Sequence, residues 1–308
     1  MTISYVQEIY LINRICPIFI FILGLLGNLC GFYTTYSKRV KKFGPIFVIR
    51  YLFIINTLFI SKIILNYTNE GFSLSENLAS NTSCRLHRYV SYTLAALPPN
   101  LLAYIAIDRY QTLKDFHTKS IFKRKFTQLF FCSCLTIFNL TFYLQIYFQS
   151  ILHEDEFEIF YQATNVSFNK VMVYCGFIDE ERHIVLTYLD HINYLILPTL
   201  IMLICAVKLI SVLLKINGLR IKKRIFKERE LAITTIVLII CYIIFNFPYA
   251  IAQFVIEDFQ TSYIYYLCFY LFYAEYSFIF YVILFTNRFY RKTFINLISK
   301  KFRQFYLN

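Results

Sequence analysis

The stretch AITTIVLIICYIIFNFPYAIA, residues 232–252, decides the fold class, because its 21 residues include no charged side chain. A helix of about 20 apolar residues spans the hydrocarbon core of a bilayer. The chain as a whole is 58% hydrophobic and 16% charged, against about 25% charged in soluble proteins. A chain of this length has no core large enough to hide several such stretches from water. These features exclude a cytosolic enzyme, a disordered linker protein and a disulfide-rich secreted module.

Six further apolar stretches flank this one and have similar lengths. They lack the alternating ten-residue pattern of a membrane β-barrel, so each predicts a spanning helix. The spans are expected near 15–36, 46–66, 86–110, 126–149, 189–214, 230–255 and 263–285. The predicted fold is an all-α membrane protein: a seven-transmembrane helix bundle (15–285), preceded by a short extracellular segment (1–14). Residues 286–308 predict an amphipathic eighth helix along the membrane surface and a short tail.

Basic residues set the predicted orientation. The segments after the first, third, fifth and seventh spans, with the adjoining span ends, hold 25 of the 31 Lys and Arg. Positive loops face the cytoplasm, so we expect an extracellular N-terminus in a multi-pass plasma-membrane protein. The net charge of +13 then reflects topology and contact with the lipid bilayer, not nucleic-acid binding.

Glycosylation sequons agree with this orientation. They begin at Asn66, Asn81 and Asn165, on or beside the predicted outside. A fourth sequon, at Asn139, lies within the fourth span, where no glycan could be attached, and shows that the triplet also arises by chance.

A short motif ends the third span on its cytoplasmic side: Ala106-Ile107 followed by Asp108, Arg109 and Tyr110. Cys84 precedes Arg109 by 25 residues, at the outer end of the same span. In this setting the chain resembles a rhodopsin-like G-protein-coupled receptor over nearly its whole length. The resemblance implies an extracellular ligand and a heterotrimeric G protein as partners, with no cofactor and no metal.

Arg109 needs anionic partners near the membrane interface. Asp108 is its neighbour, and Glu228 lies 20 residues before Pro248, where such receptors often place an acid that latches the sixth helix to the third. We hypothesise that Arg109 pairs with Glu228 at rest. The alternative is that Glu228 and Glu230 merely occupy a solvated helix start, where acids favour the positive end of the helix dipole.

The resemblance also implies a disulfide between Cys84 and Cys175, which is the only cysteine between the fourth and fifth spans. An oxidising exterior favours such a bridge. Two buried, unbridged thiols are the alternative.

Several positions match the family pattern, and one carries an amide in place of an acid. Gly27-Asn28 matches the first-span pair, and Asn56 stands where the second span usually carries the acid that supports sodium binding. Both amides can hydrogen-bond between helices. Pro198 and Pro248 match the kink positions of the fifth and sixth spans.

Other positions depart from the family. Asn246 replaces the sixth-span Trp, Tyr242 replaces a Phe, and Pro98-Pro99 interrupts the third span. The seventh-span Asn-Pro-x-x-Tyr keeps only Tyr281. Its hydroxyl could relay through water toward Arg109, or it could be one more interfacial aromatic.

Two ligand classes are disfavoured because the residues that would bind them are missing from the sequence. Ser91 stands where amine receptors carry an Asp, and the seventh span has no Lys for a retinal Schiff base. A peptide or a chemosensory cue remains, and the acidic runs 154–158 and 179–181 would attract a basic peptide. Lys62, Ser91 and Glu275 are candidate pocket residues. Lys62 and Glu275 could form a salt bridge or contact a zwitterionic ligand, and Lys62 could instead extend to the membrane surface.

Two other functions stay open. The sequence has no Walker loop, dinucleotide-binding turn or His-Glu-x-x-His motif, so we do not expect an enzyme. A small transporter or channel would also be polytopic, although the halves of the chain show no repeat. A receptor-like scaffold that does not signal is the other alternative, motivated by the missing sixth-span Trp and seventh-span Asn-Pro.

Overall fold

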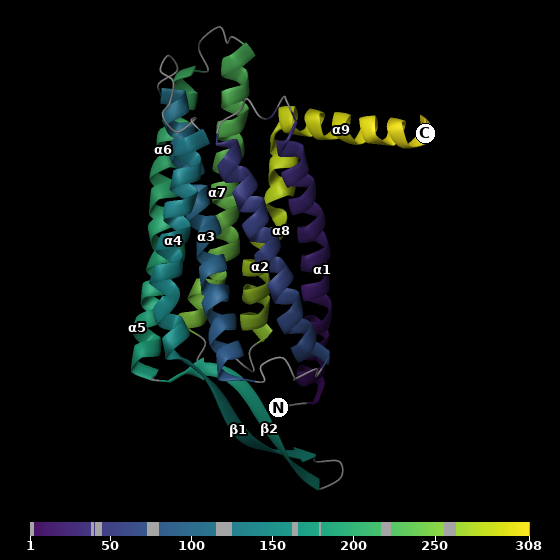
Figure 1. The fold of residues 1–308 in the computed structure, drawn as a ribbon, viewed down its shortest axis with the longest axis vertical. Coiled ribbons are helices and arrows are strands. Elements are labelled where there is room, and N and C mark those ends of the chain that lie inside the picture. Colours follow the sequence, from purple (N-terminus) through teal and green to yellow (C-terminus); the bar gives the residue numbers. More distant parts are fainter. Residues whose placement is uncertain are drawn as a thin grey trace.

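The computed structural model describes residues 3–37, 40, 45–72, 80–114, 125–161, 166–178, 180–216, 223–255 and 263–307. Long helices run side by side in an elongated bundle (Figure 1). The helices are α1 (Ile3–Thr35), α2 (Ile46–Phe72), α3 (Asn81–Lys114), α4 (Lys125–Gln149), α5 (Glu180–His191), α6 (Leu197–Ile216), α7 (Lys223–Val255), α8 (Tyr263–Thr286) and α9 (Arg288–Leu307), and a π-helical turn, η4 (Ile192–Ile196), joins α5 to α6.

The predicted seven-helix membrane bundle is confirmed. Six spans are long and apolar enough to cross a bilayer within the described residues: Arg14–Thr35, Asn81–Lys114, Lys125–Gln149, Ile184–Lys215, Phe226–Val255 and Ile264–Thr286. The predicted second span corresponds to α2, which packs against α1, α3 and α8. The fifth span is one continuous helical rod made of α5, η4 and α6.

The helices extend beyond the predicted spans. Most notably, α1 begins at Ile3, so residues 3–14 continue the helix instead of forming a separate segment, and α7 begins at Lys223 instead of residue 230. Hydropathy locates the part of a helix that lies in lipid, whereas the backbone hydrogen bonds of the helix continue past that part.

The segment between α4 and α5 is a β-hairpin, whereas the sequence predicted only an acidic loop there. Strand β1 (Ser150–Tyr161) pairs antiparallel with β2 (Val166–Phe177), with Ser150 opposite Phe177 and Tyr161 opposite Val166. The second strand is rich in β-branched and aromatic residues, which favour extended backbone. The hairpin projects beyond one end of the bundle, here called the hairpin end, and α9 projects sideways from the opposite end, the α9 end (Figure 1).

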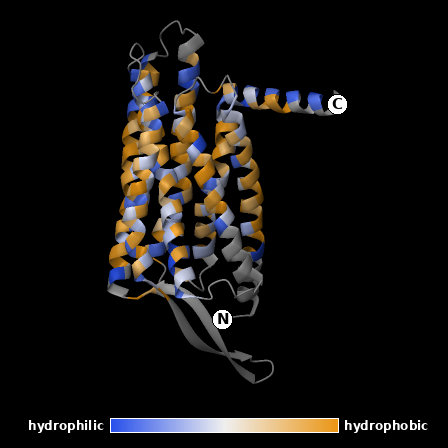
Figure 2. Ribbon diagram, in the orientation of Figure 1, coloured by the Kyte–Doolittle hydropathy of each residue, from blue (hydrophilic) through white to orange (hydrophobic). Residues whose placement is uncertain are grey.

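Apolar residues cover the sides of the bundle (Figure 2). Large side chains such as Phe130, Leu200 and Phe285 are 61%, 53% and 70% exposed. A water-soluble protein does not expose apolar side chains along whole helices. Their exposure along the spans indicates that lipid is the solvent of this surface.

Glycines allow α1 to approach its neighbours closely. A Cβ atom at Gly31 would lie 2.5 Å from the ring of Phe53 on α2, and one at Gly24 would lie 2.5 Å from Ile60. Small residues at helix contacts are the usual means of close packing in membranes, where no hydrophobic force draws helices together.

The eighth helix of the prediction is α9, and its start is capped by Asn287. The Asn287 side-chain oxygen accepts the backbone N–H of Tyr290 at 2.9 Å, as an N-cap residue does. The Tyr290 hydroxyl in turn donates to the carbonyl of Gly31 at 3.1 Å. These two bonds fix the turn between α8 and α9 against α1, and α9 leaves the bundle at a steep angle (Figure 1).

Candidate functional site

Arg109 forms a buried cluster with two acids at the α9 end of the bundle. Its Nη1 donates to Glu228 Oε2 at 3.0 Å, and its Nε donates to Asp108 Oδ2 at 3.0 Å. Nη2 makes a second contact with the same Asp108 oxygen. Arg109, Asp108 and Glu228 are 3%, 0% and 7% exposed. The hypothesised Arg109–Glu228 ion pair is therefore present, and it joins α3 to α7 across the bundle.

Burial favours this ion pair over the solvated alternative for Glu228. Glu230, two residues further along α7, is partly exposed, and its Oε2 accepts the backbone N–H of Phe289 at 3.4 Å. The two acids thus have different surroundings.

Tyr110, next to Arg109, faces Lys208 of α6, whose Nζ lies 5.4 Å from the ring centroid of Tyr110.

Pro198 explains the π-helical turn in the fifth span. A proline has no N–H to donate into the preceding turn. Here the N–H of Leu197 donates five residues back, to Ile192, and the carbonyls of Asn193 and Tyr194 accept side-chain donors from other helices. Asn100 Nδ2 of α3 reaches the Asn193 carbonyl at 3.3 Å, and the Tyr242 hydroxyl of α7 reaches the Tyr194 carbonyl at 2.7 Å.

Pro99 has the same consequence in the third span. In a regular helix the N–H of residue 99 would donate to the carbonyl of Ala95. That carbonyl instead accepts the Tyr276 hydroxyl of α8 at 3.0 Å. Pro99 and Pro198 are thus matched by tyrosines: each of these two prolines leaves a carbonyl that accepts the hydroxyl of a tyrosine on another helix.

We expect Tyr242→Phe and Tyr276→Phe each to destabilise the protein by about 1–3 kcal/mol, the cost of leaving a buried carbonyl without a donor. The measurement is thermal unfolding of the purified protein, with a fall in midpoint of several degrees. Tyr188→Phe is the matched control, because Tyr188 is 55% exposed. Unchanged midpoints for both buried variants would contradict the assignment.

Asn246 and Glu275 connect α7 to α8 beside these tyrosines. Asn246 Nδ2 donates to Glu275 Oε2 at 2.5 Å and to the carbonyl of Tyr242 at 2.8 Å. Both side chains are buried, at 0% and 3% exposure. Asn246 therefore makes a polar contact between α7 and α8. We call Tyr242, Asn246, Glu275 and Tyr276 the polar core.

The structure does not join the three candidate pocket residues. Glu275 belongs to the polar core, and no ion pair links it to Lys62 in the described part of the chain; that suggested salt bridge is wrong. Lys62 instead lies near His87 of α3, where the two repel when charged. The Ser91 hydroxyl donates to the carbonyl of His87 at 2.7 Å, within its own helix.

The two span amides differ in their contacts. Asn28 Nδ2 donates to the carbonyl of Tyr276 at 3.1 Å and so ties α1 to α8. Asn56 is fully buried, yet neither side-chain atom has a hydrogen-bond partner among the described residues. The interhelical bond expected of Asn28 is therefore present, and the one expected of Asn56 is not.

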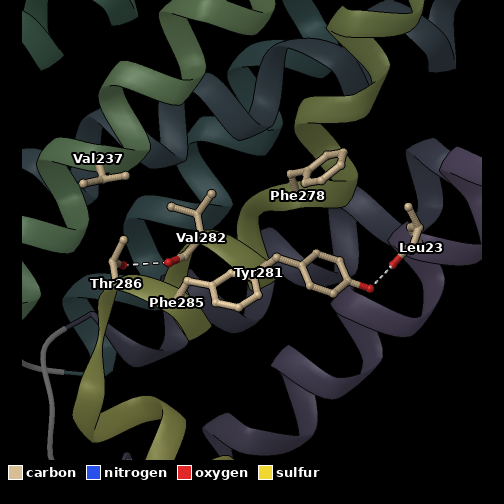
Figure 3. A pocket seen from close by; sticks show the side chains of 7 residues that line it. All are labelled: Leu23, Val237, Phe278, Tyr281, Val282, Phe285 and Thr286. Carbon is tan, nitrogen blue, oxygen red and sulfur yellow. Dashed lines mark hydrogen bonds between the residues drawn. The ribbon is translucent and has the colours of Figure 1, made fainter.

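Tyr281 does not point toward Arg109. Its hydroxyl donates to the carbonyl of Leu23 on α1 at 3.0 Å (Figure 3). The suggested relay from Tyr281 to Arg109 is therefore not present in this conformation.

Cys84 is fully buried and disulfide-bonded. Cys175 lies on β2, which contacts α3, but its side chain is outside the described part of the structure. Of the sequon residues, Asn81 is exposed at the start of α3 and Asn66 lies on α2, while Asn165 falls outside the described residues. The pairing of Cys84 with Cys175 and the three glycans stay predictions.

A polar network between α4 and the fifth span was missed from the sequence. Asn193 Nδ2 donates to Asn139 Oδ1 at 3.0 Å and to the Tyr143 hydroxyl at 3.1 Å. The Tyr143 hydroxyl donates to Asp190 at 2.6 Å. Polar residues within the spans could have indicated such a network. Their spacing in the sequence, however, does not show which helices they join.

Comparison with known proteins agrees with this geometry. None of the curated proteins compared with the chain matches it significantly. The sequence profile of the 7 transmembrane receptor (rhodopsin family) matches residues 27–287, which include α2 to α8 and the last part of α1, from Gly27 to Thr35. That range covers well over half of the 308 residues and contains both the Arg109 cluster and the polar core. The chain therefore belongs to the rhodopsin family of seven-transmembrane receptors.

Proposed function

We propose that this protein binds an extracellular ligand and activates a heterotrimeric G protein. The observation that carries the proposal is the buried ion pair between Arg109 of α3 and Glu228 of α7 at the α9 end. Two buried charges are costly unless they hold each other, and separating them requires a compensating interaction. Such a pair suits a switch that stays closed until a ligand and a partner protein favour the open form.

The α9 end faces the cytoplasm in this proposal, and the hairpin end faces outward. Support comes from the excess of Lys and Arg after the odd-numbered spans. Asn66 and Asn81 lie at the other, hairpin end of α2 and α3. The protein would then reside in the plasma membrane with its N-terminus outside.

Activation would release α7 from α3. Pro248 lies within α7, where its missing N–H removes one backbone hydrogen bond. The α9 end of α7 would then swing outward about this point when Glu228 leaves Arg109. A groove would open between α3 and α7 for a helix of the G protein. The polar core lies between this switch and the hairpin end, and its Tyr242 and Asn246 belong to the helix that moves.

The ligand we favour is a peptide or a chemosensory cue. Strand β1 carries Glu154, Asp155, Glu156 and Glu158, which give the hairpin end a negative charge suited to attract a basic peptide. Lys62 and Ser91 stay candidate pocket residues, on α2 and α3. Glu275 is buried within the bundle, which favours a role in transmission over direct contact with a ligand.

The test is ligand-independent nucleotide exchange on purified G proteins of each class, with the receptor in nanodiscs. We expect exchange above the receptor-free rate with at least one class, and loss of that excess with Arg109→Ala. Arg50→Ala is the matched control: Arg50 donates to Thr35 at the same end of the bundle but lies on α2, away from α7. Rates are compared per folded receptor.

No exchange with any G protein, from wild type or from variants that break the Arg109–Glu228 pair, would instead support a non-signalling scaffold. Solute or ion flux across proteoliposomes would support the transporter alternative. The rhodopsin family is generally non-enzymatic, and we propose no catalytic activity.

A further inference from the structure

An apolar groove runs along the outer face of α8 near the α9 end. It encloses about 510 Å³ and is lined by Leu23 of α1, Val237 of α7, and Phe278, Tyr281, Val282, Phe285 and Thr286 of α8. Figure 3 shows α8 as its floor, with Leu23 and Val237 on opposite sides. Phe278 and Phe285 are 37% and 70% exposed. We call this the α8 groove.

The α8 groove offers no free polar group to an occupant. Its two hydroxyls already donate to backbone carbonyls: Tyr281 to Leu23 at 3.0 Å and Thr286 to Val282 at 2.6 Å. A ligand that needs hydrogen bonds would find none along the walls. A hydrocarbon chain needs none and is the main component of the surrounding membrane.

Positive charge gathers where the groove ends. Phe285 and Thr286 are its last lining residues, and Arg288 follows them, exposed, at the start of α9. Arg291 Nη1 lies 3.3 Å from the carbonyl of Phe285 itself. Lys227 of α7 lies with its Nζ 4.6 Å from the ring centroid of Phe289. Glu230 is the acid beside these bases, and its Oε2 is occupied by the backbone N–H of Phe289.

We propose that the α8 groove binds one acyl chain of an anionic phospholipid from the leaflet at the α9 end. The headgroup of this lipid lies against Arg288 and Arg291. An apolar channel that ends at two arginines matches a molecule with a hydrocarbon tail and a phosphate-bearing head. A neutral lipid would fill the channel but would leave the arginines without an anionic partner. The site does not depend on G-protein coupling, so it can be tested independently of the proposed function.

The absence of Trp from this chain provides the assay. Phe285→Trp places a single fluorophore in the α8 groove, and lipids brominated on their acyl chains quench it on contact. The receptor is reconstituted in phosphatidylcholine containing either brominated phosphatidylglycerol or brominated phosphatidylcholine at equal mole fractions. We expect the brominated phosphatidylglycerol to reach half-quenching at a mole fraction lower by at least about fivefold, because each engaged base contributes roughly that enrichment and the proposal engages two.

The control is Phe130→Trp on α4, a Phe that is 61% exposed near the basic start of the helix at Lys125. It reports the general attraction of anionic lipid to the positive end of the bundle, so its preference should be clearly smaller. Arg288→Gln combined with Arg291→Gln should reduce the preference at Phe285→Trp to the control value. If Phe285→Trp does not fold, Phe278→Trp reports on the same groove.

An equal preference at the groove and control positions would overturn the proposal, because it would reduce the effect to surface charge alone. A groove preference that survives the double Arg→Gln change would also overturn it, since the headgroup contact would then lie elsewhere.

Discussion

Replacing Glu228 with Gln is expected to raise ligand-independent nucleotide exchange about tenfold per folded receptor. The Gln side chain keeps the size of Glu228 but loses the charge that holds Arg109 Nη1 at 3.0 Å. A loss of about 1.4 kcal/mol in the resting state is a factor of ten in the closed-to-open equilibrium. Close, buried charge pairs have coupling energies at or above that value. The rate of nucleotide exchange, normalised to correctly folded receptor, measures the shift.

Glu230→Gln is the matched control for this experiment. It removes an acid from the same turn of α7, but Glu230 contacts the backbone of Phe289 instead of Arg109. We expect its basal rate to stay near that of wild type. If the two variants behaved alike, Glu228 would be one of two acids at a solvated helix start, and the latch would be excluded.

Replacing Cys84 with Ser is expected to lower the free energy of unfolding by about 2–5 kcal/mol, the usual cost of losing a native disulfide. Cys84 is fully buried near the start of α3, and α3 contacts α2, α4, α6 and α7 as well as the hairpin. Loosening α3 at the hairpin end should therefore affect most of the bundle. Thermal unfolding and the yield of correctly folded protein at the cell surface are the measurements.

Cys175→Ser identifies the partner. If Cys84 and Cys175 are bridged, the single variants lose the same stability and the double variant loses no more than either one. Cys134→Ser is the control, because Cys134 is a free, exposed cysteine of α4, and it should leave unfolding unchanged. Additive losses in the double variant would show that Cys84 is bridged to another residue.

The polar core shows why single family motifs misled the sequence analysis. Asn246, Tyr242 and Pro99 each depart from the family pattern when considered one at a time. In the structure each has a partner on another helix: Tyr276 satisfies the carbonyl freed by Pro99, Tyr242 donates to the carbonyl of Tyr194, and Asn246 bonds Glu275. Such contacts join residues on different helices, and sequence spacing carries no information about which helices face each other.

The Lys62–Glu275 salt bridge failed for the same reason. Two opposite charges in separate spans are each costly in lipid, so pairing them was a reasonable hypothesis. Their rotation about the helix axes decides whether they meet, and packing turns Glu275 toward Asn246 instead. Asn56 likewise is buried but has no hydrogen-bond partner among the described residues.

The amino-acid sequence by itself determined the seven-helix membrane fold, because a long apolar stretch without the alternation of a barrel strand satisfies most of its backbone N–H and C=O groups in a bilayer by forming a helix. The sequence also determined one partner of Arg109, since Asp108 is its neighbour in the chain. Only the tertiary structure decided the hairpin between α4 and α5, the direction of Tyr281 and the partners of the polar core. These depend on how neighbouring helices are rotated and packed, and packing is set by many weak side-chain contacts at once instead of by any local pattern.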